Sequence, residues 1–268
     1  MPVPELLRYE LGDEVTAFST MRRGGYGTGD YAEFNANSYC GDDKSVVEKN
    51  KDLLCRQLCI DKSSLIIPHQ THGTGVLCID ADFLCLTAAE QEPQLEGVDA
   101  LVTGLHDVCI SVSTADCVPV LMYDCQHHVV AAVHAGWRGT VAGIVDNVLT
   151  VLRGEYGTLP TQIKAVIGPS ISIDSFEVGD EVYEMFSDAG FPMLNIAKRY
   201  PAQGVTGDKW HLDLWEANRH LLLQCGVLEE NIAVAGICTY QQHERFFSAR
   251  RLGIQSGRIL TGIMIKKK

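Results

Sequence analysis

The sequence predicts a mixed α/β fold with mixed, largely antiparallel sheets and helices packed outside them. Apolar runs of strand length outnumber the helical segments. Four of these runs follow one another between residues 98 and 136, separated only by short turns. Because parallel strands need a long crossover connection, this close succession favours antiparallel pairing over a doubly wound parallel sheet.

The expected strands are apolar runs bounded by turn residues. The first begins at residue 15 and gives way to a loop rich in glycine and asparagine that continues to residue 43. Residues 63–80 contain two short runs separated by the loop 68–73. The remaining expected strands are 98–104, 107–114, 117–124, 128–136, 163–171, 231–239 and 257–265.

Four segments have helical signals. Ser45 with Glu48 has the spacing of a capping box, so a helix is expected from there to about residue 59. Residues 140–152 carry their apolar side chains on one helical face, and 180–188 form a third expected helix. The fourth begins at Asp213 and ends at Gly226.

The composition limits the size and the partners. A chain of 268 residues, 46 % of them apolar, can bury the core of one large domain or two small ones. A net charge of −12 argues against nucleic acid and against an anionic membrane surface, since both would be repelled. We also expect no transmembrane helix, because no apolar run approaches the ~20 residues needed.

The compartment is predicted from the N-terminus and the cysteines. The first 15 residues lack a basic segment followed by a long apolar one, so no secretory signal is expected. The 10 cysteines form no CxxC pair, and most lie within apolar runs. This distribution is typical of reduced, buried thiols in a cytoplasmic protein and not of a disulfide framework.

Cys117 and His134 are the first candidates for chemistry. Cys117 begins one strand-like run and His134 lies near the end of the next. A hairpin centred on Gln126 would put Val118 opposite His134. Cross-strand neighbours have Cβ atoms ~5 Å apart, so the thiol and the imidazole can meet. They could form a Cys–His pair or half of a metal site. The alternative is a small buried cysteine beside a satisfied core histidine.

His72 is the candidate third member, because it lies in the tight loop 68–73 at a strand end. Two histidines and one thiolate suit Zn²⁺ and leave a fourth position open, as catalytic zinc sites do. His69 competes with His72 for the ligand position, or it orients the ligands together with Gln70 and Asp116. Asp116 could instead brace the strand end or transfer a proton.

Arginines in loops are candidates for binding an anion. Arg138 lies in the strand-to-helix segment 134–140, whose glycines and free N–H groups could hold one. Arg22 precedes two glycines, and Arg250 and Arg251 follow an aromatic pair. Phosphate or carboxylate is the expected ligand. Ion pairing with the abundant acidic side chains is the alternative for each arginine.

Several segments together resemble one family. They are FSTMRRGG (18–25), FNANSYCGDD (34–43), PHQTHG (68–73), VDALVT (98–103), STADCVPVLMYD (113–124), VAAVHAGWRGT (130–140), VIGPSI (166–171), CT (238–239) and FFSARRLGIQSGR (246–258). In this order they are similar to the multicopper polyphenol oxidase, or laccase-like, family. That family includes the YfiH–YlmD–FAMIN group of purine nucleoside phosphorylases.

The resemblance implies a single domain over residues 1–268 with a four-layer α/β/β/α sandwich. It implies that His72, Cys117 and His134 bind the metal, usually zinc, and carry the catalysis. It also implies phosphorolysis of adenosine, inosine and 5′-methylthioadenosine, with deamination of adenosine, which makes the enzyme a transferase and a hydrolase. Arg22, Asn35, Arg250 and Arg251 are expected near the nucleoside or the phosphate.

Two other activities remain open at this point. The same Cys–His pair or zinc site could attack an amide carbonyl, as in editing of a peptidoglycan precursor. One cysteine and two histidines could also bind copper, which is the metal of the older family description. Oxidation by several coppers needs many paired histidines, and among the 9 histidines only His127 and His128 are adjacent.

Overall fold

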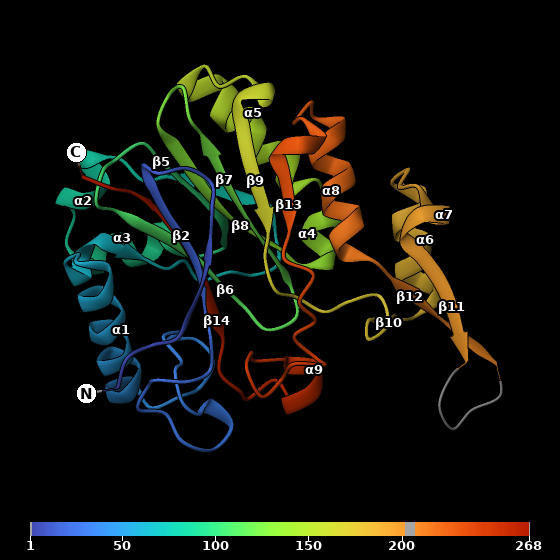
Figure 1. Cartoon of the computed structure of the whole chain (residues 1–268), viewed down its shortest axis with the longest axis horizontal. Coiled ribbons are helices and arrows are strands. Elements are labelled where there is room, and N and C mark those ends of the chain that lie inside the picture. Colours follow the sequence, from blue (N-terminus) through green and yellow to red (C-terminus); the bar gives the residue numbers. More distant parts are fainter. Residues whose placement is uncertain (1, 202–206, 268) are drawn as a thin grey trace.

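The computed structural model describes residues 2–201 and 207–267 and contains two large sheets (Figure 1). The six-stranded sheet has the order β13-β9-β7-β8-β5-β4, and the five-stranded sheet has the order β1-β2-β14-β6-β3. The strands of the first are β4 (Gly75–Cys78), β5 (Val98–Thr103), β7 (Val118–Asp124), β8 (Val129–Ala135), β9 (Ile163–Ile167) and β13 (Ile232–Val234). Those of the second are β1 (Leu6–Tyr9), β2 (Val15–Thr20), β3 (Leu65–Ile66), β6 (Cys109–Thr114) and β14 (Ile259–Ile265).

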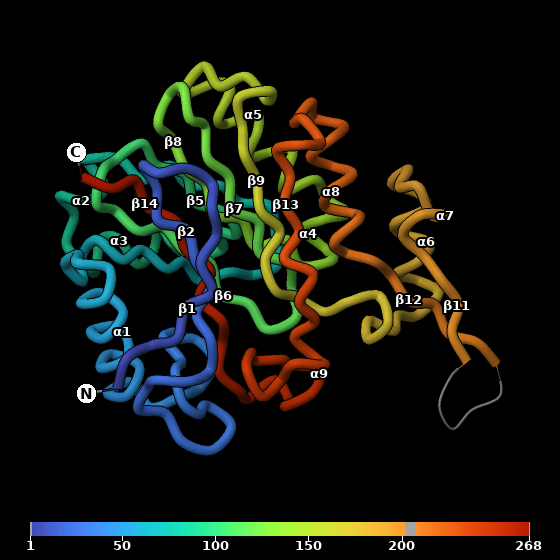
Figure 2. The backbone as a smooth tube through the Cα atoms, in the orientation of Figure 1, coloured from blue at the N-terminus to red at the C-terminus, as the bar shows by residue number. Residues whose placement is uncertain are grey.

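Most strand pairs are antiparallel, as expected, and three are parallel: β3 with β6, β4 with β5, and β9 with β13. The two ends of the chain meet in the five-stranded sheet. There β2, near the N-terminus, lies beside β14, near the C-terminus, as the blue and red segments of Figure 2 show. Such a sheet forms only when the ends of the sequence come together.

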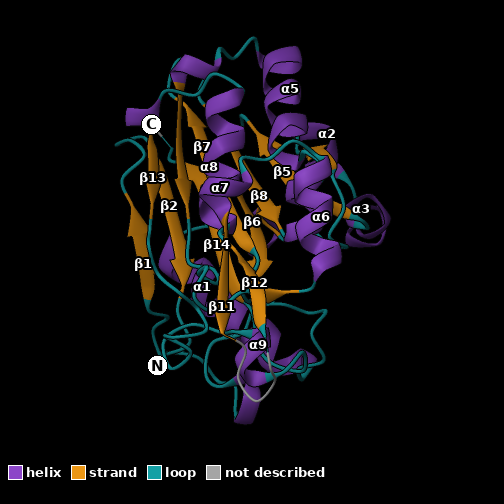
Figure 3. Ribbon diagram, turned by 90° about the vertical axis from the view of Figure 1, so that its right-hand side faces the viewer, coloured by secondary structure: helices purple, strands orange, loops and turns teal. Residues whose placement is uncertain are grey.

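Three apolar clusters build four layers. One lies between the six-stranded sheet and the helices α5 (Ile144–Tyr156) and α8 (Leu214–Gln224), which also pack on each other (Figure 3). A second lies between the two sheets. A third lies between the five-stranded sheet and α1 (Lys44–Leu58). The order is therefore helix, sheet, sheet, helix, which confirms the predicted α/β/β/α sandwich.

The period of two along β8 divides its side chains between these clusters. Val129, Ala131 and Val133 face the helices, whereas Val130 and Ala132 face the other sheet. His134 continues the second set at the end of the strand. Because both faces of β8 are covered, the strand is a continuous apolar run, and a polar residue within it is exceptional.

The helices follow the predicted pattern with shifted boundaries. The capping box at Ser45 is wrong, because the N-cap lies two residues earlier: α1 begins at Lys44, and Asp43 caps it by accepting from the N–H groups of Ser45 and Val46. The predicted helix 140–152 is two helices, α4 and α5, divided at Gly143, which has a φ of 77°. The other helices are α2 (Ala81–Cys85), α3 (Ala88–Leu95), α4 (Trp137–Val141), α6 (Asp180–Asp188), α7 (Met193–Ile196) and α9 (Ala249–Leu252).

A third, small sheet was not predicted. It has the order β10-β12-β11 and lies to one side of the two large sheets with α6 and α7 (Figure 1). Its strands are β10 (Glu177–Val178), β11 (Ala197–Pro201) and β12 (Asp208–Leu212). These segments are mostly exposed and polar, so they lack the apolar runs by which the other strands are recognised.

The β7–β8 hairpin forms as predicted, but its register is shifted by one residue. His134 pairs with Pro119, and Val118 pairs with Ala135. The turn covers residues 125–128, and Asp124 fixes it by accepting from the N–H groups of Gln126 and His127. The prediction placed the centre on Gln126, whereas a four-residue turn has its centre between Gln126 and His127.

Replacement of Leu121 by alanine tests the packing between the sheets. Leu121 is fully buried in that cluster, so we expect the free energy of unfolding to fall by about 2–5 kcal/mol. Urea denaturation monitored by circular dichroism measures this. Leu194→Ala, at a side chain that is 99 % exposed, is the matched control and should change stability by less than about 0.5 kcal/mol. Equal effects in the two variants would contradict the layer assignment.

Candidate active site and metal centre

His72, Cys117 and His134 come together at one edge of the sandwich. Their ligand atoms all lie within 4.8 Å of one another. The two imidazole rings meet edge to face, with 4.9 Å between their centroids. His134 is buried, Cys117 is partly buried and His72 is exposed. The site is therefore anchored in the core and opens toward solvent on the side of His72.

The two large sheets share this site. His134 ends β8 of the six-stranded sheet, and His72 lies in the loop between β3 and β4. Cys117 stands where the chain leaves β6 in one sheet and enters β7 in the other. The preceding residue, Asp116, has a φ of 92°, a conformation that is uncommon for a residue with a side chain. The crossing between the sheets therefore fixes the position of the thiol.

Asp99 links the two histidines. It is fully buried on β5, and its Oδ1 lies 2.7 Å from Nδ1 of His134. The same oxygen accepts from the backbone N–H of His72 at 3.0 Å. Its Oδ2 accepts from the N–H groups of Gly73 and Thr71 at 2.7 and 3.3 Å. One carboxylate thus orients the His134 ring and holds the loop that carries His72.

The backbone at His72 depends on this support. Its φ of 64° lies in the left-handed region, which side chains other than glycine seldom adopt. Such a conformation persists when the surroundings over-determine it, and here three successive N–H groups point at Asp99. The loop 68–73 is therefore a fixed turn around a buried carboxylate.

The electrostatics favour a thiolate. Burial alone would raise the pKa of Cys117, but the neighbouring His134 and His72 lower it below its ordinary value. Burial would likewise lower the pKa of His134, but Cys117 and Asp99 raise it. Burial opposes ionisation of Asp99 too, and its hydrogen bonds to His134 and Gly73 nevertheless lower its pKa. The protein thus stabilises a negative sulfur beside an oriented imidazole.

The donor set fits a transition metal with an open position. Zinc takes thiolate and imidazole ligands, and catalytic zinc sites have three protein ligands. Within the described ranges the group contains three ligands, with no fourth histidine, cysteine or carboxylate joining it. Asp99 is hydrogen-bonded to Nδ1 of His134, which leaves Nε2 for a metal. A carboxylate in this position is the usual support of a metal-binding histidine. The same donors also suit copper.

Gly136 leaves room for an ion. A Cβ atom at this position would lie 3.0 Å from Cδ2 of His72 and 3.2 Å from Sγ of Cys117. The backbone there is extended, with a φ of −63°, so glycine is not needed for its conformation. Glycine at this position instead keeps the space directly beside the three ligand side chains free of a Cβ atom.

A cavity of about 310 Å³ opens over the site, at the lower end of the ~300–1,000 Å³ range of small-molecule pockets. All three ligand residues line it, together with Tyr39 and His69. The rings of Tyr39 and His69 are stacked, with centroids 4.2 Å apart. The other lining residues are Asn37, Cys40, Gln70, Ser113, Thr114, Ala115, Ala249, Ile254 and Arg258.

The three residues expected to orient the ligands have separate roles. His69 stays outside the group of three and pairs through Nδ1 with Glu96 at 2.6 Å. The Gln70 side chain accepts from N–H of Ser113 and donates to its carbonyl, which ties the loop 68–73 to β6. Asp116 accepts from the Thr239 hydroxyl and from the N–H of Arg250. The geometry of Asp116 is that of a brace.

Among the described residues, the four arginines expected to bind an anion are not part of the cavity lining. Arg22 donates to the carbonyls of Ala32 and His243. Arg138 stacks on Trp137, with its guanidinium carbon 4.2 Å from the ring centroid. Arg250 donates to the Glu177 carbonyl, and Arg251 to the Tyr240 hydroxyl. Arg258, which the sequence analysis did not single out, does line the cavity.

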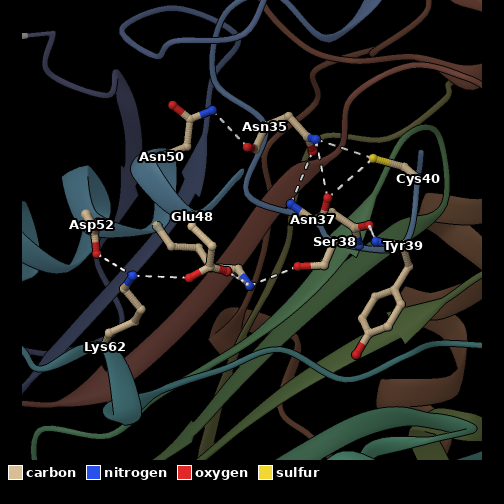
Figure 4. A network of polar contacts seen from close by, with 10 residues as sticks. Asn35, Asn37, Ser38, Tyr39, Cys40, Glu48, Asn50, Asp52 and Lys62 are labelled. Carbon is tan, nitrogen blue, oxygen red and sulfur yellow. Dashed lines mark hydrogen bonds and ion pairs between the residues drawn. The ribbon is translucent and has the colours of Figure 1, made fainter. Parts of the chain in front are cut away.

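Asn35 is buried and supports the loop that carries Tyr39 (Figure 4). Its Nδ2 donates to the Asn37 carbonyl, and its own carbonyl accepts from Asn50 of α1. Asn37 in turn accepts from the N–H of Tyr39 at 2.7 Å. This network fixes one wall of the cavity, and the Asn35 side chain lies behind that wall.

The sandwich thus presents three potential metal ligands beside a cavity at one edge. The chain belongs to the family described as multi-copper polyphenol oxidoreductase laccase, whose model matches residues 16–266. A purine nucleoside phosphorylase of Bacteroides thetaiotaomicron is 49 % identical over 94 % of this chain and 92 % of its own. The adenosine deaminase RL5 of an unknown prokaryotic organism is 46 % identical over 94 % of both chains.

Solved structures agree with this assignment. The hypothetical protein YfiH of Bacillus licheniformis superposes with a TM-score of 0.89 at 26 % identity, covering 98 % of this chain and 97 % of its own. YlmD of Geobacillus stearothermophilus has a TM-score of 0.86 at 27 % identity over the full length of both. Across the residues described here, no helix has both the length and the apolar character that a bilayer span requires.

Replacement of Asp99 by asparagine tests the support of the ligands. We expect the affinity for Zn²⁺ to fall about 10- to 100-fold, because the carboxylate that orients His134 is lost. Competition with a chromogenic chelator measures it. Asp124→Asn is the matched control, since Asp124 is also buried and pairs with His127 at 2.8 Å away from the site. Equal losses in both variants would contradict a specific role of Asp99.

Gly136→Ala tests the space beside the ligands. The added methyl group would displace the His72 and Cys117 side chains by a few tenths of an ångström, so we expect the affinity for Zn²⁺ to fall about tenfold. Gly154→Ala is the control, because no atom lies within 4 Å of the new Cβ and alanine favours a helix by about 0.5–1 kcal/mol. An unchanged affinity in Gly136→Ala would show that the site tolerates the methyl group.

Proposed function

We propose that this chain is a zinc-dependent purine nucleoside phosphorylase that acts on adenosine, inosine and 5′-methylthioadenosine and also deaminates adenosine. The observation that carries the proposal is the open His72–Cys117–His134 group, which lines a cavity of small-molecule size. Relatives at 49 % and 46 % identity bear the names of these two activities. The substrates are then a nucleoside and phosphate.

Phosphorolysis makes separate demands on the site. Cleavage of the glycosidic bond builds positive charge on the ribose and negative charge on the departing purine. A bound zinc ion would supply Lewis-acid polarisation at the base of the cavity. Asp99 occupies Nδ1 of His134, which leaves Nε2 of that ring to face the metal position. His69, held at Nδ1 by Glu96, keeps Nε2 for proton exchange with the departing purine.

Deamination uses the same cavity. Attack by water on the purine ring needs a nucleophile at the base of the cavity, where the ligands lie, and a proton for the departing amine. Tyr39 and His69 line the cavity with their rings stacked on each other, and an outer ring face of this pair would be the place for a purine to stack. Both reactions therefore need the same ligand geometry and the same base-binding wall.

A second candidate is hydrolysis of an amide in a peptidoglycan precursor. It rests on the juxtaposition of the Cys117 thiol with two imidazoles, since a lowered thiol pKa favours a nucleophile. Release of an amino acid from such a precursor, without turnover of nucleosides, would favour it. Copper-dependent oxidation of phenols has weaker support, because the described residues contain one group of three potential ligands and not a cluster for several coppers.

We place the activity in the cytoplasm. All ten cysteines of the chain are free thiols, and Cys117 must be reduced to bind a metal. Nucleosides and inorganic phosphate are small molecules, which suits a cavity of about 310 Å³. No nucleic-acid or membrane partner is proposed for a chain with a net charge of −12.

The test is incubation of zinc-loaded protein with adenosine, with and without phosphate, followed by chromatography and mass spectrometry. Adenine with ribose 1-phosphate, and inosine, are the expected products. Cys117→Ala should lower both rates at least about 100-fold with the fold intact, because a metal ligand is lost. Cys125→Ala, at a partly buried thiol in the β7–β8 turn, should retain both activities. Absence of turnover in zinc-loaded protein would reject the proposal.

A further inference from the structure

One side-chain nitrogen in the wall of the cavity has no partner. Asn37 lines the cavity and is 8 % exposed. Its Oδ1 accepts from the backbone N–H of Tyr39 at 2.7 Å, and because an N–H group needs an acceptor, this bond fixes which end of the amide is the nitrogen. Within residues 2–201 and 207–267, Nδ2 of Asn37 forms no hydrogen bond. Two N–H donors are therefore unused in a buried side chain.

The unused nitrogen can be reached from the cavity. Six side-chain atoms of the described residues are sealed from solvent without a partner, and Nδ2 of Asn37 is not one of them. The nitrogen therefore keeps contact with solvent although its residue is buried. Because Asn37 lines the cavity, the cavity is the space into which this donor opens. Native proteins pair nearly all buried polar groups, so an acceptor on a ligand is the natural partner.

The loop 34–43 holds this donor in place (Figure 4). Asn35 accepts from the N–H of Asn37 and donates to its carbonyl, so one side chain ties both backbone groups of Asn37. The Cys40 thiol donates to the same carbonyl. Asn35 is fixed in turn by Asp42, which accepts from its Nδ2 at 2.9 Å. Asn35, which was expected near the substrate, thus acts on the cavity through Asn37.

We infer that Asn37 binds the purine base by donating from Nδ2 to N7. The inference rests on the proposed function and extends it, because it assigns recognition of the base to one side chain. Adenosine, inosine and 5′-methylthioadenosine differ at position 6 of the base or at the 5′ carbon, whereas N7 and N3 are acceptors in all three. Of these two, N7 shares the five-membered ring with the departing N9. The amide is also bonded to Tyr39, which belongs to the wall proposed for stacking.

A donor at N7 favours departure of the purine. When the bond from C1′ to N9 breaks, its electron pair stays on the purine and spreads to N7, while a phosphate oxygen forms the new bond to C1′. The proton lost by phosphate ends on a purine nitrogen, and the amide keeps its own protons. The hydrogen bond from Asn37 strengthens as this charge develops. In deamination, water attacks C6 and ammonia leaves, so charge develops in the six-membered ring and the bond to N7 serves binding alone.

Kinetics of Asn37→Asp and Asn37→Ala test the inference. Asn37→Asp removes the donors but keeps an acceptor for the N–H of Tyr39, so the loop should stay in place. We expect kcat/KM for phosphorolysis of inosine to fall about 10- to 100-fold in both variants, because a hydrogen bond to a developing charge is lost. For deamination of adenosine, the KM should rise while kcat stays within about twofold. Ser38→Ala, at the exposed neighbour that binds Lys51, is the matched control and should retain both activities.

Binding of base analogues identifies the ring nitrogen. Inosine is not consumed without phosphate, so isothermal titration of zinc-loaded protein can compare it with 7-deazainosine and 3-deazainosine. The wild type should bind 7-deazainosine about tenfold more weakly than inosine, and Asn37→Ala should bind these two alike. The inference is overturned if Asn37→Ala abolishes the discrimination against 3-deazainosine instead, if it still discriminates against 7-deazainosine, or if the two reactions lose kcat equally.

These outcomes separate the inference from the proposed function. If Asn37→Ala abolishes the discrimination against 7-deazainosine while the wild type turns over neither nucleoside, the contact to the base stands and the proposed function fails. If nucleosides are turned over while Asn37→Ala discriminates as the wild type does, the proposed function stands and the contact is rejected.

Discussion

The acceptance of four hydrogen bonds by Asp99 is the constraint on which the site depends. The carboxylate is fully buried, which is costly unless it is hydrogen-bonded, and all four bonds come from segments that carry ligands, one from His134 and three from the loop of His72. It orients His134 at the end of β8 and holds His72 in a left-handed conformation between β3 and β4. One buried carboxylate thus sets the positions of both histidines.

The sandwich makes this contact possible because the chain crosses from one sheet to the other at this edge. The chain passes from β6 in one sheet to β7 in the other through Asp116 and Cys117. Asp116 there joins Thr239 and the start of α9, so segments distant in sequence converge on the same crossing. The short bend of residues 115–117 between these two strands thus positions the thiol.

Apolar runs with clear turn residues predicted the mixed, largely antiparallel sheets and the two central strands, whereas the four-layer order was implied by the family resemblance. The sequence also grouped His72, Cys117 and His134. The expected hairpin, the loop 68–73 and the family resemblance made this possible, since spacing alone is weak evidence. Asp99 was missed, although an acidic residue inside the apolar run 98–103 is a signal of a paired buried charge. The shift in the hairpin followed from turn geometry set by Asp124, which periodicity does not encode.

The placement of positive charge explains how an acidic chain can bind an anion. With a net charge of −12, the field of the whole protein does not attract phosphate, so the donors must be local and preorganised. Four arginines that the motifs suggested are engaged with carbonyls, a hydroxyl or an aromatic ring elsewhere. Arg258, in contrast, lines the cavity. The positive charge that Arg258 supplies at the cavity is therefore local, since the field of the acidic chain as a whole opposes the approach of an anion.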